Sequence, residues 1–397
     1  MQRLPRYAVL QPGARLHYAV PALLARAGAL AALYTDLHGD HRSLRTLGAL
    51  WPPGRQPPAL QRLLARRLPV DLPRRLVREQ VWATLIGRGA PALLQRATRE
   101  GFAGAEAVYT SFINDDLETV ERARDQGLSV IHELIISADA GRILLEERRR
   151  FPGVEPAGEA AEVVEAGIAR DRRKWAVSQR VLVPSIYCRD SCLALGCDPA
   201  RLRLVPYGIP EHWFDLPVSP EPGRLLSVGR VGLGKGHHYL AEACRLLRRR
   251  RVPHHCRIAG AWQVDVTTPL FAGPTYLGPV PRSRMAAEVQ RADVVVLPTL
   301  TDSFALAHLE AMACGVPVVT TSHCGALVRD GVEGFVVPVR DAEALADRLQ
   351  RLIEDRDLRQ RLGAAARRRA LDHGWSRYGE RLLTALQWSP AGEAPAP

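Results

Sequence analysis

The chain has 397 residues, enough for two domains of ordinary size, and its 47% apolar and 24% charged residues are typical of a soluble globular protein. Its formal net charge is +12, because 54 Lys and Arg residues stand against 42 Asp and Glu residues. A basic protein favours anionic partners, but no zinc finger, helix-turn-helix or aromatic RNA-binding signature accompanies this charge, so we expect no nucleic-acid partner.

The N-terminal sequence contains only a short apolar run and no small-residue cleavage pattern, so we expect no signal peptide. The longest apolar stretch, residues 19–34, is interrupted by Arg26 and is too short to span a bilayer comfortably. Both features predict a cytoplasmic protein. Of the seven cysteines only Cys188, Cys192 and Cys197 cluster, and no CxxC pair or nearby His completes a zinc site, so we expect small buried residues there.

The chain begins with a short predicted strand over residues 7–10, followed by a Gln11-Pro12-Gly13 turn. A helix is predicted from about His17 to Ala27, and residues 31–34 predict a second strand. A lone glycine after a strand, such as Gly13, is typical of a turn.

Residues 51–80 form a basic segment. Seven Arg residues lie between Arg55 and Arg78, interleaved with Leu and Val, against the single acid Asp71. Proline pairs predict a loop at its start, and short basic amphipathic helices are predicted after it. Such a surface suits anionic lipid or an anionic acceptor, which would place the protein at the inner face of a membrane. The alternative is a solvated face of an Arg-rich protein.

Two further strands are predicted at residues 107–109 and 128–131, with a helix over residues 115–126 between them. The second strand continues directly into His132 and Glu133. A histidine at the carboxyl end of a parallel strand is placed where such sheets bind ligands. The alternative is a structural hydrogen-bonding histidine, and Glu133 is a weaker candidate. A long helix over residues 159–177 and a strand over residues 181–183 follow, and the Pro-rich stretch 217–223 predicts a domain boundary.

The second half opens with a predicted strand at residues 225–228 and the Gly-rich sequence GRVGLGKG, residues 229–236. Arg230 and Lys235 flank this loop, and Lys235 is one of only two lysines in the chain, with Lys174. Two cations beside a flexible backbone can neutralise a diphosphate. The loop is not a Walker sequence, because no Ser or Thr follows the lysine.

The stretch from residue 294 to residue 319 predicts a strand, a polar turn, a helix and another strand. Asp302 lies just before the helix, and Glu310 lies about two turns along it, at 3.6 residues per turn. Glu310 is surrounded by Leu309, Ala311 and Met312, where a carboxylate needs a partner such as a ribose diol. The alternative is an acid at the start of the helix and an ordinary partnered glutamate.

The sequence DSFALAHLEAMACGVPVV, residues 302–319, resembles the signature of the large retaining glycosyltransferase family that uses nucleotide-sugar donors, the glycosyl transferases of group 1 (family 4). The family pattern is Glu, seven residues, Glu, and this chain has Asp302, seven residues, Glu310. The order VGR, four residues, KG at Arg230 and Lys235 is similar to the family's phosphate clamp. The resemblance implies an α/β GT-B fold, in which two Rossmann-like domains face each other across a cleft.

The resemblance also implies site residues. His132, Asp302 and Glu310 are the catalytic candidates: the first two would orient the donor sugar and Glu310 would hold the ribose. The predicted donor-binding residues are Gly13, Arg230, Lys235, Ser303, Phe304, Ala305, Leu306 and Glu310. Gly208 takes the backbone role of a family turn that leads into the linker between domains. The helix dipole near Ser303 would add to the clamp, so no metal and no cofactor beyond the donor are expected.

We therefore predict an N-terminal acceptor domain over residues 1–205, a donor domain over residues 206–375, a helix crossing back over residues 376–388 and a disordered tail over residues 389–397. The predicted activity is transfer of a sugar, with retention, from a nucleotide-diphosphate donor to an unidentified acceptor. Two alternatives stay open: a nucleotide-sugar epimerase of the same fold, and a non-catalytic nucleotide-sugar-binding paralogue. The sequence Asp355-Arg356-Asp357 is expected to be a solvated part of a helix.

Overall fold

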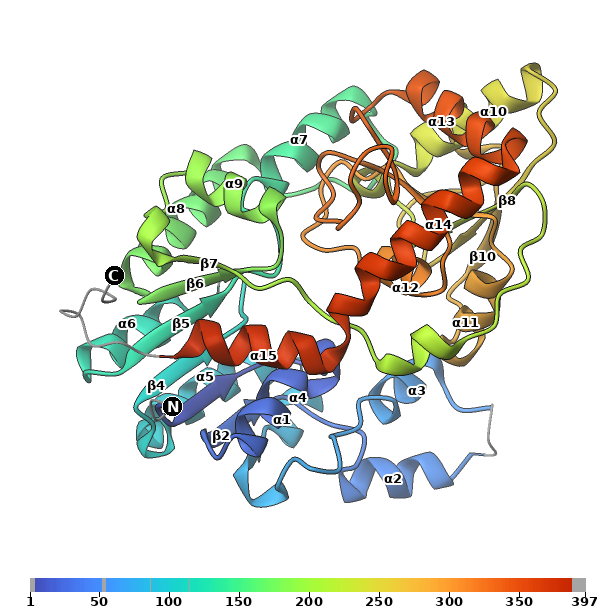
Figure 1. Ribbon diagram of the computed structural model, residues 1–397. Helices are drawn as coiled ribbons and strands as arrows, with labels where there is room; N and C mark the ends of the chain where they lie inside the picture. Colours follow the sequence, from blue (N-terminus) through green and yellow to red (C-terminus); the bar gives the residue numbers. More distant parts are fainter. Residues whose placement is uncertain (1–3, 52–54, 86, 114, 388–397) are drawn as a thin grey trace, which may run out of the picture.

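The computed structural model describes residues 4–51, 55–85, 87–113 and 115–387. Within them the chain forms two sheets in which every strand pair is parallel. The first sheet has the strand order β3-β2-β1-β4-β5-β6-β7, and the second has the order β10-β9-β8-β11-β12-β13. In Figure 1 the strands of the first sheet are coloured blue to green, and those of the second sheet are coloured yellow-green to orange. Both orders reverse direction once, as in Rossmann-like folds.

The first sheet and its helices take up the N-terminal half of the chain. Its strands are β1 (Tyr7–Leu10), β2 (Leu30–Thr35), β3 (Val77–Glu79), β4 (Ala107–Thr110), β5 (Ser129–Glu133), β6 (Arg180–Val183) and β7 (Leu202–Leu204). Its helices are α1 (Ala19–Arg26), α2 (Arg42–Ala49), α3 (Pro58–Leu64), α4 (Val81–Leu85), α5 (Gly89–Arg99), α6 (Leu117–Asp125), α7 (Ala140–Arg150), α8 (Ala161–Val177) and α9 (Ile186–Ala194). The central strands are fully buried, which explains their continuous apolar runs.

The second sheet takes up the C-terminal half. Its strands are β8 (Arg224–Val228), β9 (His255–Ala259), β10 (Thr275–Gly278), β11 (Val294–Leu297), β12 (Val318–Thr321) and β13 (Gly334–Val337). The helices of this half are α10 (His237–Arg249), α11 (Arg282–Gln290), α12 (Leu306–Ala313), α13 (Ala342–Glu354), α14 (Arg356–Ala370) and α15 (Trp375–Leu386).

The point where the second sheet reverses its order lies between β8 and β11. These strands pair in register, with Val295 opposite Leu226, so their carboxyl ends lie side by side. The Gly-rich loop that follows β8 therefore meets the turn that follows β11. Ligands of open parallel sheets bind at such reversal points.

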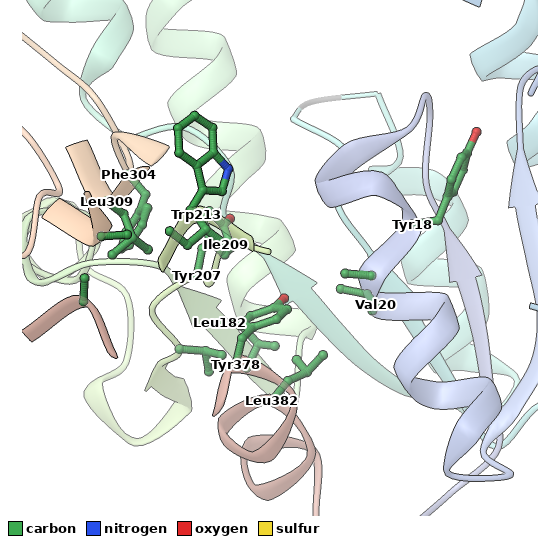
Figure 2. Close-up of a cluster of buried hydrophobic side chains, with 14 of the residues drawn as sticks. Tyr18, Val20, Leu182, Tyr207, Ile209, Trp213, Phe304, Leu309, Tyr378 and Leu382 are labelled. Atoms are coloured by element: carbon green, nitrogen blue, oxygen red, sulfur yellow. The ribbon is translucent and has the colours of Figure 1, made fainter. Parts of the chain in front are cut away.

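One apolar cluster joins the two halves. Figure 2 shows Tyr207, Ile209 and Trp213 of the connecting segment close to Phe304 and Leu309 of the second half, all of them buried. The same cluster includes Tyr378 and Leu382 of α15 and Tyr18 and Val20 of the first half.

The last helix, α15, returns to the first half of the molecule and lies alongside its sheet (Figure 1). Its end is fixed by the Tyr7 hydroxyl, which donates to the Leu386 carbonyl at 3.0 Å. Its start passes so close to Gly208 that a Cβ there would lie 2.8 Å from the Gly374 carbonyl oxygen and 2.9 Å from the Cβ of Tyr378. Glycine at position 208 is therefore required by packing. The predicted tail, residues 389–397, lies outside the described residues.

One local prediction is wrong. The end of the basic segment was predicted to be helical but forms the edge strand β3, since Val77 pairs with Leu33 of β2. The helix predicted from about His17 to Ala27 forms over Ala19–Arg26, because residues 16–18 adopt left-handed backbone angles. Asp355 and Asp357 are exposed at the start of α14, and the Asp355 side chain also caps this helix by accepting from the Leu358 N–H at 2.8 Å.

Candidate donor site at the ends of β8 and β11

The turn after β11 holds the central ion pair of the site. Asp302 and the Lys235 ammonium are in direct contact, although 67 residues separate them in the chain. The other oxygen of Asp302 accepts from the Phe304 N–H at 3.3 Å, just before α12 begins. The backbone of Asp302 bridges to Cys324, which fixes the turn from the other side. An acid and a cation from two loops thus face each other at the carboxyl edge of the sheet.

The Gly-rich loop is shaped by its glycines. Gly236 has φ of 67°, and a Cβ there would collide with the Pro298 carbonyl of the neighbouring turn. This close approach brings Lys235 beside the turn that carries Asp302. Arg230 lies in the same loop with its side chain exposed to solvent. The two cations of the predicted clamp therefore sit at one edge, one engaged with Asp302 and one open to solvent.

Glu310 lies on α12, with only 13% of its side chain exposed. Burial raises the pKa of this carboxyl to about 7, although the Arg282 guanidinium acts in the opposite direction. The Arg282 Nη2 atom lies 3.7 Å from Glu310 Oε1, and Arg282 is itself half exposed. A buried carboxylate with one distant, half-exposed partner can accept hydrogen bonds from a ligand such as a diol.

The remaining predicted donor-binding residues surround the start of α12. Ser303 Oγ donates to the Ile135 carbonyl of the first half at 2.8 Å. Phe304 packs edge-on against Tyr207, with ring centroids 5.2 Å apart. Ala305 is the N-cap and gives no side-chain hydrogen bond, and Leu306 is the first helical residue. The N-terminus of α12 is thus capped by no side chain of its own and points its dipole toward the ion pair.

His132 belongs to the first half of the chain. It is buried at the end of β5, and the side chain of its neighbour Glu133 points to the opposite face of the sheet. Burial, followed by the nearby Lys174 ammonium, lowers the pKa of His132 well below its usual value, so the ring is neutral. Lys174 is held by Asp116 at 2.7 Å and by the Phe112 carbonyl at 2.9 Å. Among the described residues, no contact joins His132 to Asp302 or Lys235.

Gly13 lies in the first half with φ of 69°. Its N–H donates to Asp36 Oδ1 at 2.9 Å, and the Asp36 carboxylate pairs with Arg66 at 2.9 Å. The turn that follows, Arg15–Tyr18, brings His17 into contact with Arg282. Gly13 thus starts the segment of the first half that reaches the Glu310 side of the site.

The structure adds functional candidates that the sequence analysis missed. Thr301 Oγ1 lies 2.5 Å from Ser137 Oγ and 3.2 Å from the Tyr187 hydroxyl, so three hydroxyl groups from both halves meet beside Asp302. His17 and Arg282 meet on the Glu310 side. The only sequence signal for Thr301 was its place in the polar turn, and nothing local pointed to Ser137 or Tyr187.

The described residues were also examined for cysteine clusters, metal sites and membrane-spanning helices. All seven cysteines are buried and free, and Cys188, Cys192 and Cys197 belong to one apolar cluster. In the described part of the chain, no group of three or more His, Cys, Asp or Glu side chains is arranged to hold a metal ion. No helix among the described residues is both long and apolar enough to span a membrane.

Comparison with solved structures defines the class of fold. The structure resembles a crystal structure of HepE from Anabaena with a TM-score of 0.66 at 15% identity, covering 96% of this chain and 99% of that one. It resembles sucrose-phosphate synthase from Thermosynechococcus elongatus with a TM-score of 0.61 at 18% identity, covering 96% and 98%. Two Rossmann-like domains with parallel sheets, arranged as in these proteins, form the GT-B fold, which confirms the predicted fold class.

Sequence comparison gives the family. Residues 209–369 match the family model described as glycosyl transferases group 1. The chain is 29% identical over 303 residues to D-inositol 3-phosphate glycosyltransferase of Pseudarthrobacter chlorophenolicus, covering 68% of each protein. It is 27% identical over 321 residues to the amylovoran biosynthesis glycosyltransferase AmsK of Erwinia amylovora, covering 73% of each. It is 32% identical to putative colanic acid biosynthesis glycosyltransferase WcaL of Salmonella typhimurium, covering about half of each. The C-terminal half of this GT-B fold therefore matches the glycosyl transferases of group 1, as the resemblance predicted, and the relatives are named glycosyltransferases.

Proposed function

We propose that this enzyme transfers a sugar from a nucleoside-diphosphate donor to an acceptor, with retention of the anomeric configuration. The observation that carries the proposal is the Lys235–Asp302 pair at the point where the second sheet reverses its strand order. The related fold of HepE has been crystallised with UDP-glucose, which supports a nucleotide-sugar donor. The chain's relatives named above act in the synthesis of sugar-containing products, which supports transfer to an acceptor over epimerisation.

Different residues of the site would bind different parts of the donor. Lys235 and Asp302 pair with each other, so the site offers one cation and one acid side by side to a ligand. A donor diphosphate would take Lys235 and Arg230, and sugar hydroxyls would donate to Asp302. Charge gathers on the diphosphate as the anomeric bond breaks, so the two cations and the uncapped N-terminus of α12 stabilise the departing group.

Glu310 would bind the ribose hydroxyls two turns along α12 from the phosphates. For His132 we propose the role that the family resemblance implies, which is orientation of the donor sugar. Its side chain would have to leave its buried position to do so.

The contacts of Ser303 with Ile135 and of Thr301 with Ser137 close the two halves over the turn. Such closure excludes water and prevents hydrolysis of the donor.

A thermal-shift panel tests the proposal. A ligand that binds only the folded protein raises its Tm by an amount that grows with concentration. We expect one of UDP, GDP, ADP or their sugars to raise the Tm of the wild type, and Lys235→Ala to lose most of this rise. Arg249→Ala, at a 62% exposed cation of α10 away from the loop, is the matched control and should keep it.

No rise with any nucleotide at millimolar concentration would contradict the proposal. Product analysis then separates the remaining alternatives. A new glycoside identifies a transferase, an altered donor sugar without an acceptor identifies an epimerase, and donor binding without any product supports the non-catalytic paralogue.

A further inference from the structure

Residues 16–18 form a strained turn in the first half of the chain. Leu16, His17 and Tyr18 have φ values of 45°, 53° and 60°, so three residues with side chains follow one another in the left-handed region. Each Cβ makes this conformation unfavourable, and a run of three is retained only where the surroundings enforce it. Such strain is characteristic of functional sites.

The surroundings of this turn are an unusually buried ionic group. The Arg15 side chain donates to Glu133 Oε1 through Nε at 3.2 Å and through Nη2 at 3.0 Å. Tyr207 donates to the same oxygen at 2.7 Å, and Tyr109 donates to Glu133 Oε2 at 2.8 Å. The Arg15 guanidinium also lies over the Tyr207 ring, 5.1 Å from its centroid. Glu133 is nearly fully buried, and both of its carboxylate oxygens accept hydrogen bonds. We call this group of Arg15, Glu133, Tyr109 and Tyr207 the foundation of the turn.

This foundation connects three parts of the molecule. Arg15 follows β1, Glu133 ends β5, and Tyr207 belongs to the segment between the two sheets. Tyr207 in turn packs edge-on against Tyr378 of α15, with centroids 6.1 Å apart, and both residues appear in Figure 2. The turn is therefore anchored to the elements that fix the first half relative to the second.

At its other end the turn presents His17 to the second half. The Arg282 guanidinium donates to His17 Nε2, and its other nitrogen lies 3.7 Å from Glu310 Oε1. Burial and then Arg282 lower the pKa of His17, so the ring is neutral and can accept this hydrogen bond. His17 also lies beside Trp375, the first residue of α15, at 6.1 Å between ring centroids. A residue of the first half thus sets the position of the only cation that faces Glu310 in the described structure.

We propose that the strained turn is a positioning device for donor binding: Arg15 and Glu133 hold the turn so that His17 keeps Arg282 beside Glu310, over the ribose end of the donor. This inference rests on the proposed function, and it adds residues of the N-terminal half to the donor site. When ribose hydroxyls take Glu310, the guanidinium held by His17 stays above the nucleoside and closes that end of the site. Arg15, Glu133 and His17 act through Arg282, so they are positioning residues.

Replacing His17 by glycine distinguishes a positioning role of this residue from a purely structural one. Because glycine adopts positive φ without strain, His17→Gly should raise the Tm of the ligand-free enzyme while it removes the Arg282 contact. We expect the donor KM of His17→Gly to rise about tenfold with kcat within about twofold, since the lost contact is made equally in ground and transition states. A merely structural residue would lose stability and affinity together.

Ala103→Gly is the matched control. Ala103 has φ of 55° in a second left-handed turn, which precedes β4 and so lies at the amino ends of the parallel strands, whereas residues 16–18 follow β1 at their carboxyl ends. Its replacement should also raise the Tm but leave the donor KM unchanged. His17→Gln, which keeps a hydrogen-bond acceptor near the position of Nε2, should restore part of the donor affinity.

The foundation is tested by Arg15→Lys and Glu133→Gln. Both variants keep hydrogen-bonding groups but lose the charged fork, and both should raise the donor KM in the same direction as His17→Gly. If the wild type transfers sugar and His17→Gly keeps the wild-type donor KM, the positioning inference is wrong and the proposed function stands. If the wild type neither binds nor uses any nucleotide sugar, both fail.

Discussion

Among the residues of the site, one charge has a close partner and another has only a distant one. Lys235 is matched by Asp302, but buried Glu310 has only the Arg282 guanidinium at 3.7 Å. Burial therefore keeps the pKa of Glu310 near 7, well above that of an ordinary glutamate. A carboxyl in this state is sensitive to any ligand that donates hydrogen bonds to it.

Nucleotide binding should therefore release protons near neutral pH. Two ribose hydroxyls donating to the Glu310 carboxylate favour its charged form and lower its pKa, so a carboxyl that is part-protonated at pH 7 loses its proton on binding. We expect titration calorimetry in buffers of different ionisation enthalpy to show proton release that is largest near pH 7. The release should vanish in Glu310→Gln.

The pH dependence of nucleotide affinity follows from the raised pKa of Glu310. Above pH 8 the free carboxyl is already charged and below pH 5 it is protonated in the free enzyme, so affinity should fall as pH decreases through 7. Proton uptake on binding, or release unchanged in Glu310→Gln, would contradict the assignment of Glu310 to the ribose.

At the scale of elements, α2 and the loop between α3 and β3 present apolar and basic side chains to solvent. Leu47 and Leu50 at the end of α2 and Val70 of the loop are exposed, as are Arg42 and Arg45 on α2. Figure 1 shows α2 and α3 at the bottom of the view, away from both sheets. An exposed mixture of Leu and Arg on a short helix is typical of a surface that lies on anionic lipid.

We expect the enzyme to sediment with phosphatidylglycerol vesicles and not with phosphatidylcholine vesicles. Arg42→Glu with Arg45→Glu should abolish this binding, since each basic residue near an anionic surface contributes about 1 kcal/mol. The control is Arg122→Glu with Arg124→Glu on α6, which makes the same change in net charge at exposed positions of another helix. Equal loss in both variants would show that only net charge matters.

At the scale of the whole molecule, α7 fastens the first half onto the second. Glu147 is completely buried and accepts from Tyr239 at 2.7 Å and from Arg340 Nε at 2.7 Å, while His238 lies 3.0 Å away. Burial opposes ionisation, yet these three partners lower the pKa of Glu147 to about 2. All three partners belong to the C-terminal half, so one carboxylate joins the two halves on the side opposite α15 (Figure 1).

Replacing Glu147 should weaken the contact between the two halves of the chain. Glu147→Ala leaves Arg340 and His238 without their shared partner, so we expect a loss of about 3–5 kcal/mol of stability and an increased radius of gyration in X-ray scattering. Its neighbour Glu146 is 50% exposed, and Glu146→Ala should cost at most about 1 kcal/mol. Because the folded pKa of Glu147 is lowered, its stabilising effect should be lost in wild type as pH falls from about 4.5 to 2. A compact Glu147→Ala variant with wild-type Tm would contradict this role.

Local patterns in the sequence were sufficient to predict the class of protein. Apolar runs such as residues 294–297, bounded by Pro298, and the Gly-rich loop at residues 229–236 fix strands and turns through local chemistry alone. The spacing of Asp302 and Glu310 on one turn and helix, with Arg230 and Lys235 upstream, carried the resemblance to group 1 glycosyl transferases, and the family comparison confirmed it. Short-range patterns were sufficient for this, because each depends on residues within one element.

Which side chains contact one another depends on tertiary packing. The alternation of side chains along β5 means that His132 and Glu133 face opposite sides of the sheet, and only packing determines that Glu133 faces Arg15 and Tyr207. The helix predicted from about His17 begins at Ala19, after a left-handed turn at residues 16–18 that directly follows the buried Arg15. Contacts such as Lys235 with Asp302 and Arg282 with His17 join residues far apart in the chain, and no local pattern encodes them. Their geometry depends on how the two halves of the chain pack together through their shared apolar cluster.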